Sequence, residues 1–231
     1  MIEAPAILLF WLLFGRGGRG ASPPNNGSGG DVAPAGEAYD EGVWPRAVPK
    51  GGEVPIKLTG IAPPAAWRKS RFDAVIDFLM NDPRSLDAMT SLFEHHVIEK
   101  GDIGIDGIAL SVVAHWDIET ASGTAEWNYN VGGVLAVPGQ QHFVSTDVGD
   151  PGAKVAFCAY NSLQEGIADY FGVLSYERYV RALAPLLMLP TDPTWFSELG
   201  WAGYYGMDPV QAEGVIAARR QLVAADVGSN Q

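Results

Sequence analysis

The sequence predicts an α+β protein, mainly α, in which a helical domain with a small β-hairpin lobe follows an extended N-terminal arm. Three observations predict this class. Apolar residues recur at helical spacing from residue 63 onward, two β-prone runs flank one turn signal, and the first 60 residues are rich in glycine and proline. The chain is therefore divided into a short apolar anchor, residues 1–14, a Gly/Pro-rich linker or arm, residues 15–62, and one domain, residues 63–231.

The composition is that of a globular protein with a sizeable core. Of the 231 residues, 47% are apolar and 10% aromatic, and the formal net charge is −12. Residues 1–60 hold six acids and five bases, so the rest of the chain carries a charge of −11. Such an acidic domain lacks the basic surface that nucleic acid requires. Cys158 is the only cysteine in the sequence, so an internal disulfide and multi-cysteine metal sites are excluded. We expect no metal and no cofactor.

The apolar N-terminal segment is too short to cross a bilayer comfortably. Residues 4–14 carry no charge and would form a helix of roughly 16 Å, whereas a span needs about 20 residues. Glu3 precedes the segment and Arg16 and Arg19 follow it, which is the reverse of the charge order of a secretory signal. We expect the segment to be retained as a membrane or assembly anchor.

Several helix starts in the domain have recognisable capping sequences. Apolar residues at helical spacing predict a helix over residues 64–81. One capped start is "SLQE", where Ser162 and Glu165 have the spacing of a capping box. Three further starts share an Asp-Pro pair, in which the aspartate is the N-cap and the proline the first helical residue. These pairs are Asp82-Pro83, Asp192-Pro193 and Asp208-Pro209.

One β-hairpin is predicted between the helices. The runs 141–146 and 154–160 are rich in β-prone residues, and the turn signal "GDPG" lies between them.

A helix over residues 105–120, "IDGIALSVVAHWDIET", ends in two acids with different predicted surroundings. At 100° per residue, Glu119 falls about 50° from the centre of the apolar stripe and Asp117 more than about 100° from it. We therefore expect Asp117 on the solvated surface and Glu119 half-buried at the helix C-terminus, where burial and the helix dipole disfavour a charged carboxylate. A protonated carboxyl is what a general acid in glycoside cleavage requires. A glutamate that merely closes the helix is the alternative.

The stretch "AHWDIETASGTAEWNYNVGGVLA", residues 114–136, resembles the core motif of the glucosaminidase family of bacterial cell-wall hydrolases, which includes autolysins and flagellar muralytic domains. "FCAYNSLQEGIADYFGVL" and "WAGYYGMDPVQAEGVIAARRQL" resemble two later family blocks in the same order, so the resemblance covers about residues 104–222. It implies a lysozyme-like fold with a saccharide groove beside the β-lobe. It also implies cleavage of the β-1,4 bond between N-acetylglucosamine and N-acetylmuramic acid in peptidoglycan.

The resemblance also implies which residues act. Glu119 would be the proton donor, and Tyr170 would line the reacting sugar. The matching positions expected to shape the substrate site are Thr120, Gly123, Tyr129, Asn130 and Gly133.

The second catalytic group stays open. Asp147 in the hairpin is the favoured base, with Glu126 as an alternative, whereas Asp150 in "GDPG" fits a turn former better. An N-acetyl sugar can also supply its own nucleophile, in which case no second carboxylate is needed.

The sequence departs from the family pattern at several positions. Ala121 and Ser122 replace a Gly-Trp pair, Gly132 replaces a phenylalanine, Leu135 a lysine and His115 a glutamine. These departures lead to two hypotheses: the groove has an altered substrate specificity, or the chain has lost catalytic activity. A lytic transglycosylase on the same glycan and an inactive structural subunit that retains the fold are the alternatives to a hydrolase.

The expected partner is a peptidoglycan glycan strand. Together, anchor and arm indicate protein partners in a large assembly, either a phage particle or an envelope complex, with a membrane contact through residues 4–14. The expected location is the virion or the bacterial cell envelope.

Overall fold

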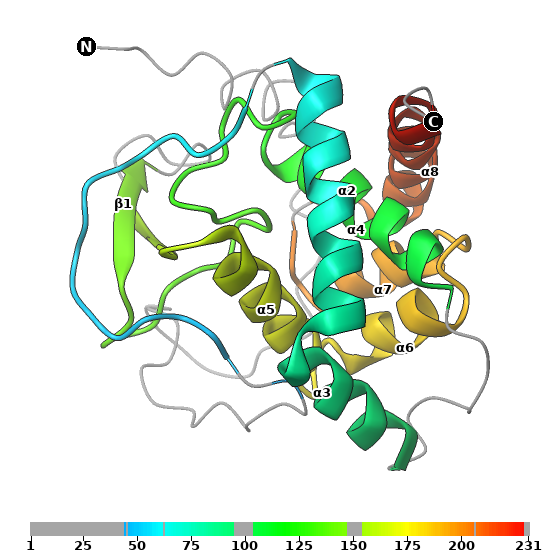
Figure 1. Ribbon diagram of the computed structural model, residues 1–231, viewed down its shortest axis with the longest axis horizontal. Helices are drawn as coiled ribbons and strands as arrows, with labels where there is room; N and C mark the ends of the chain where they lie inside the picture. The colour runs from blue at the N-terminus through cyan, green and yellow to red at the C-terminus, as the bar shows by residue number, and fades with distance from the viewer. Residues whose placement is uncertain are drawn as a thin grey trace, which may run out of the picture.

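The computed structural model describes residues 44, 46–61, 63–94, 104–146, 154–205 and 207–228. These residues form a mainly helical α+β structure, which confirms the predicted fold class (Figure 1). The elements are α2 (Pro64–Asn81), α3 (Pro83–Glu94), α4 (Ile105–Glu119), β1 (His142–Thr146), β2 (Lys154–Cys158), α5 (Leu163–Leu174), α6 (Val180–Met188), α7 (Thr194–Trp201) and α8 (Pro209–Gly228). The predicted anchor and residues 15–43 of the predicted arm lie outside the described residues.

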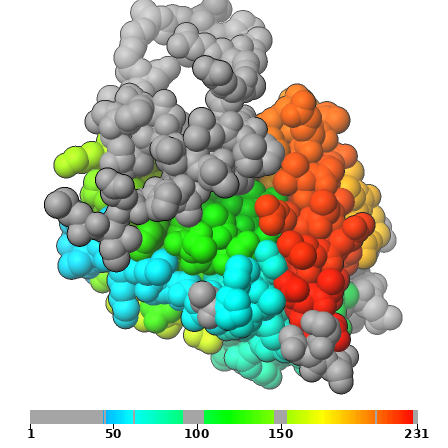
Figure 2. All heavy atoms as spheres, turned by 90° about the horizontal axis from the view of Figure 1, so that it is seen from above, coloured from blue at the N-terminus to red at the C-terminus, as the bar shows by residue number. Residues whose placement is uncertain are grey.

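Helix α4 is the central element of the helical part. It packs against α2, α6 and α8, and α2 and α8 also contact each other. Figure 2 shows α2 and α8 side by side on one face. Every residue from Val112 to Ile118 is buried. This stretch of the helix has no solvated face, so each polar side chain on it needs a protein partner.

The prediction that Asp117 is a solvated surface residue is wrong. Asp117 is 1% exposed. Its Oδ1 accepts a hydrogen bond from Arg68 Nε of α2 at 2.7 Å, and its Oδ2 accepts one from Arg219 Nη1 of α8 at 3.0 Å. The polar side of the helical wheel therefore faces two arginines of neighbouring helices instead of water.

The predicted hairpin is confirmed. Strands β1 and β2 pair antiparallel, with Phe143 opposite Phe157. Their rings stack with centroids 5.6 Å apart. The turn between the strands, with Asp147 and Asp150, lies outside the described residues.

The last part of the predicted arm packs against the domain. Residues 46–61 pass along the outer edge of the β-lobe, in blue in Figure 1. The Gln141 N–H donates to the Pro49 carbonyl at 2.7 Å, and the Val54 N–H donates to the His142 carbonyl, also at 2.7 Å. The folded unit thus extends N-terminal to residue 63, the boundary that composition indicates.

Trp44 extends the folded unit further. Its side chain is fully buried, and its ring stacks on Phe171 of α5 with centroids 5.0 Å apart. The ring of Phe78 in α2 also stacks on Phe171, with centroids 5.6 Å apart. One aromatic cluster therefore joins the arm to two helices of the domain.

The predicted capping sequences begin helices in the structure. Asp82 and Asp208 accept hydrogen bonds from backbone N–H groups two residues ahead, each at 2.9 Å, and α3 and α8 begin on the prolines between. Ser162 Oγ accepts from the Glu165 N–H at 3.2 Å, as a capping box requires. Helix α7 begins at Thr194, one residue later than predicted.

Candidate functional site

Glu119 is the last residue of α4, and the chain turns sharply after it. Residues 121–123 all have positive φ, although Ala121 and Ser122 are not glycines. Such backbone conformations are costly and are concentrated at functional sites. The Glu119 side chain is 22% exposed. The predicted half-buried carboxyl at a helix end is confirmed.

His115 lies one turn before Glu119 and faces the same carboxyl. The two residues are four apart on α4, and His115 Nε2 is 3.4 Å from Glu119 Oε1. On the other side of the ring, His115 Nδ1 is 2.7 Å from the Tyr170 hydroxyl of α5. The imidazole is fully buried. Its two nitrogens thus face Glu119 and Tyr170.

Aromatic rings enclose the imidazole on its remaining sides. The rings of Trp195 and Phe196 in α7 and of Tyr204 after α7 approach edge-on, with centroids 5.0 to 6.0 Å from that of His115. This enclosure excludes water from the ring nitrogens and strengthens their polar contacts.

Two consecutive glycines bring the loop after α4 close to this cluster. A Cβ built on Gly133 would lie 3.0 Å from Glu119 Oε2, and Gly133 has a φ of +65°. A Cβ on Gly132 would lie 2.4 Å from the Tyr170 ring, and the Gly132 carbonyl accepts a hydrogen bond from the Tyr204 hydroxyl at 2.6 Å. Residue 132 therefore has no room for a side chain, because a Cβ there would displace Tyr170.

The tyrosines around Glu119 stay protonated. Burial raises the pKa of the Tyr170 phenol well above its usual value, and the charge of Glu119 raises it further. Burial likewise raises the pKa of Tyr204, with added contributions from Tyr170 and Glu119. Both hydroxyls therefore remain hydrogen-bond donors through the neutral and mildly alkaline range.

Other acids of the described core are held by arginines. Glu126 is fully buried, and its Oε1 accepts from Arg71 Nη2 at 2.6 Å. Asp169 is also fully buried, and its Oδ1 lies 2.5 Å from Arg46 Nε. Glu126, one of the alternatives for the base, thus forms a structural ion pair with Arg71, as Asp117 does with Arg68. In the described part of the chain, the side chain that faces the Glu119 carboxyl is His115, and no arginine or lysine forms an ion pair with it.

Three of the five predicted substrate residues are packed against, or hydrogen-bonded to, other groups of the folded chain. Thr120 is buried, and its Oγ1 donates to the Trp116 carbonyl at 2.7 Å. Gly123 lies so close to Trp67 that a Cβ would be 2.3 Å from its ring. The Asn130 amide donates to the Val134 and Cys158 carbonyls and accepts from the Val134 N–H.

Of the two other predicted substrate residues, Gly133 lies beside the carboxylate. Tyr129 is half-buried with a φ of 57°, and its N–H donates to Thr59 Oγ1 at 2.8 Å. The predicted catalytic Tyr170 is fully buried behind His115. Asp147 lies outside the described residues.

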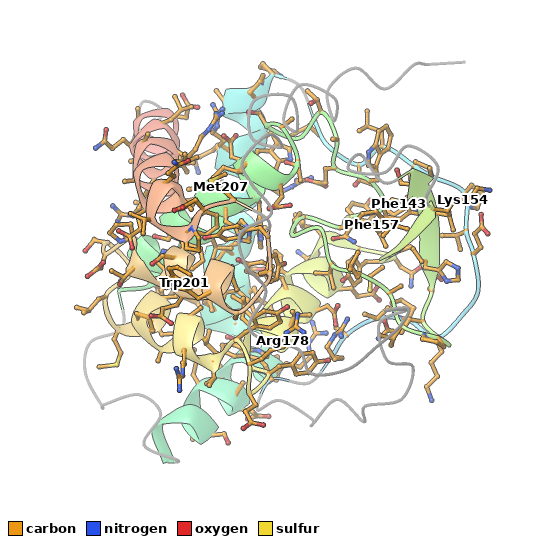
Figure 3. The ribbon with its side chains drawn as sticks, turned by 180° about the vertical axis from the view of Figure 1, so that it is seen from behind. Phe143, Lys154, Phe157, Arg178, Trp201 and Met207 are labelled. Carbon is orange, nitrogen blue, oxygen red and sulfur yellow. The ribbon has the colours of Figure 1, made fainter. Side chains whose placement is uncertain are left out.

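The hairpin and the C-terminal helices present aromatic or apolar side chains on separate parts of the molecule. Figure 3 shows Phe143 and Phe157 together on the hairpin, apart from Trp201 at the end of α7 and Met207 before α8. Trp201 is 68% exposed.

His115 and Tyr204 complete the site, although the sequence does not predict either as a site residue. Spacing could have indicated His115, because a residue four before Glu119 shares its helix face. No local pattern indicates Tyr204, which is brought to His115 by the packing of the segment after α7.

Within the described ranges, no group of three or more histidine, cysteine, aspartate or glutamate side chains is arranged to hold a metal ion. Comparison of the chain with protein-family models, with curated proteins and with solved structures finds no significant match. The resemblance to the glucosaminidase family therefore stays a prediction that rests on the quoted residues.

Proposed function

We propose that this chain is a glycoside hydrolase that cleaves the β-1,4 bond between N-acetylglucosamine and N-acetylmuramic acid in peptidoglycan, with Glu119 as the proton donor. One observation carries the proposal. Glu119 is partly exposed at a helix end beside a histidine, whereas Asp117, Glu126 and Asp169 are buried and paired with arginines. A carboxyl without a fixed cationic partner can exchange a proton with a substrate.

The surroundings of Glu119 suit acid catalysis. The protonated carboxyl would give its proton to the glycosidic oxygen as the bond to the sugar carbon breaks. Gly133 lies beside Oε2 and has no side chain, so no Cβ from this residue crowds that oxygen. A buried histidine lies behind Oε1, with its Nε2 3.4 Å from that oxygen.

The second half of the reaction needs a group that attacks the sugar carbon. We propose Asp147 as a base that activates water, which in inverting enzymes requires a carboxylate about 6.5 to 9.5 Å from the acid. The N-acetyl group of the substrate is the alternative nucleophile, and it needs no second carboxylate.

A lytic transglycosylase is the second candidate. Its support is the same pairing of the other described acids, because one free carboxyl suffices when the sugar's own hydroxyl attacks. An inactive structural subunit that retains the fold is the non-enzymatic alternative.

The proposed setting is a phage particle or an envelope complex. The N-terminal arm would bind protein partners there, and residues 4–14 would contact the membrane. Among the described residues, no helix is both long enough and apolar enough to cross a bilayer.

The experiment incubates the full chain with purified peptidoglycan and identifies the new ends by mass spectrometry. Glu119→Gln is the test variant, and Glu177→Gln, which changes an exposed acid, is the matched control. We expect N-acetylglucosamine reducing ends from wild type and Glu177→Gln, and a loss of at least about 100-fold in Glu119→Gln.

Other products would decide between the alternatives. Ends of 1,6-anhydro-N-acetylmuramic acid that depend on Glu119 would replace the hydrolase by the transglycosylase. Release that is equal in wild type and Glu119→Gln would contradict the role of Glu119. No release, with glycan binding retained, would support the structural subunit.

A further inference from the structure

His115 links Glu119 to a buried tyrosine through the two nitrogens of one ring. Nδ1 is 2.7 Å from the Tyr170 hydroxyl, which is within hydrogen-bond distance. Nε2 is 3.4 Å from Glu119 Oε1, and no hydrogen bond satisfies this buried nitrogen among the described residues. A buried polar nitrogen normally has a partner, and the Glu119 carboxyl is the group it faces.

The direction of these contacts follows from what each group can donate. Tyr170 is fully buried and keeps its phenolic proton, and among the described residues the acceptor that the structure places at its hydroxyl is His115 Nδ1. We therefore assign this hydrogen bond as donated by Tyr170. A neutral imidazole that accepts at Nδ1 carries its proton on Nε2. The Nε2–H then points at Glu119 Oε1.

Few charged or titratable groups face the ring. Glu119 faces it from α4, Tyr170 from α5 and Tyr204 from the segment after α7. Trp195 and Phe196, the neighbours from α7, are uncharged. Among the described residues, Glu119 is therefore the group whose change of charge most alters the electrostatic potential at the imidazole.

We propose that His115 is a positioning residue that holds Glu119 through its Nε2–H and stabilises the carboxylate that forms when Glu119 gives up its proton. The inference rests on the proposed acid role of Glu119. In that step the O–H bond at Oε2 breaks, the proton goes to the glycosidic oxygen, and the electron pair stays on the carboxylate. His115 keeps its own proton throughout. The contact is stronger to the carboxylate than to the neutral acid, so it lowers the barrier of the step.

The first test is independent of activity. Nuclear magnetic resonance of protein with ¹⁵N-labelled histidine, at a series of pH values, reports which ring nitrogen of His115 carries the proton. We expect the Nε2–H tautomer in wild type, and an Nε2 shift that changes with the same midpoint as the Glu119 carboxyl carbon. In Glu119→Gln this pH-dependent change should be absent. An Nδ1–H tautomer, or a shift that ignores Glu119, would overturn the proposal.

The second test separates kcat from KM in three variants. His115→Leu removes both contacts, and Tyr170→Phe removes the donor to Nδ1. His115→Gln replaces the imidazole by an amide, which can also donate and accept. His115→Leu should lower kcat by about 10- to 100-fold, the size expected for one hydrogen bond to a charged group. KM should change less than about threefold, because the buried ring does not face solvent. His115→Gln should recover most of the lost kcat, and Tyr170→Phe should fall between.

These results separate the two proposals. Normal kcat in folded His115→Leu, with wild type active, overturns the positioning role alone. Coupled resonances in a chain that releases no glycan support the His115–Glu119 link and contradict the hydrolase. Thermal melting of each variant shows whether it is folded. If His115→Leu does not fold, the resonances of wild type and Glu119→Gln still decide the case.

Discussion

Two acids that are two residues apart on α4 have opposite surroundings. Asp117 is enclosed by Arg68 and Arg219, whereas Glu119 is partly exposed and faces a histidine. The sequence predicts the exposure of Glu119 and is wrong about Asp117. A helical wheel separates apolar from polar positions, but it does not reveal whether water or arginines of other helices lie opposite the polar side.

Asp117→Asn is expected to destabilise the protein strongly. The variant keeps the shape of the side chain but replaces charge-assisted hydrogen bonds from Arg68 and Arg219 by contacts to a neutral amide, while Arg68 keeps its ion pair with Asp226. The free energy of unfolding should fall by about 2 kcal/mol or more. Asp73→Asn is the matched control, since Asp73 pairs with Lys69 on the surface and should contribute less than about 1 kcal/mol. Urea unfolding of both variants measures the difference. Equal effects would contradict the buried role of Asp117.

Gly133→Ala should impair the site, and Gly139→Ala should not. Both glycines have positive φ, so each substitution carries a similar backbone cost of about 1 kcal/mol. A methyl on Gly133 meets Glu119 Oε2 at 3.0 Å, whereas one on Gly139 meets no described atom within 4 Å. The test compares glycan release by the two variants, after their melting temperatures have been shown to be similar. Equal loss of activity in both would show that the backbone, and not the contact with Glu119, is responsible.

At the scale of elements, local signals predict starts and turns well. The Asp-Pro pairs and the capping box are set by contacts within a few residues, and the hairpin pairs two runs that are neighbours in the sequence, which is why their sequences suffice. Helix α6 is not predicted, because its sequence carries Pro185 in its interior and its N-cap makes no side-chain hydrogen bond. The burial of α4 and the approach of Tyr204 to His115 depend on how distant helices pack, and no short pattern encodes that.

The junction of α2 and α3 should lose stability in acid. Hydrogen bonds from the Arg84 side chain hold the pKa of the Asp82 carboxyl below its usual value. Because the folded pKa is the lower one, this contribution is present above about pH 4 and is lost as the pH falls through the folded value. The stability difference between wild type and Asp82→Asn should therefore shrink from pH 6 to pH 2.5, as measured by urea unfolding.

Arg84→Met provides the control for this pH effect. Without the guanidinium, the carboxyl of Asp82 loses its main stabilising partner. The stability difference that Asp82→Asn causes in the Arg84→Met background should then depend less on pH, with the backbone N–H groups of residues 84 and 85 maintaining the remainder. A difference that persists unchanged would assign the effect to another group.

At the scale of the whole molecule, composition places the domain boundary too far along the chain. The Gly/Pro-rich sequence before residue 63 is typical of a linker, yet residues 46–61 pair with the β-lobe and Trp44 is fully buried. These contacts are made by isolated side chains and single backbone hydrogen bonds. Such contacts leave no periodic pattern for a sequence analysis to detect.

A chain of residues 44–231 should be several kcal/mol more stable than a chain of residues 63–231. The shorter chain leaves a cavity where Trp44 packs and leaves Asp169 buried without Arg46, and each loss costs about 3 to 5 kcal/mol. Urea unfolding of both chains measures the difference, and Trp44→Ala in the longer chain should reproduce part of it. Equal stability would mean that the arm contributes little.

The attachment of the arm also sets where mechanical load enters the fold. Arg46 bonds to Asp169, Trp44 stacks on Phe171, and between these two partners in α5 lies Tyr170, which bonds to His115. A pull applied to Trp44 would be borne by the same turn of helix that contacts the histidine behind Glu119. The contacts of the arm and the contact to His115 are thus made by neighbouring residues of one helix.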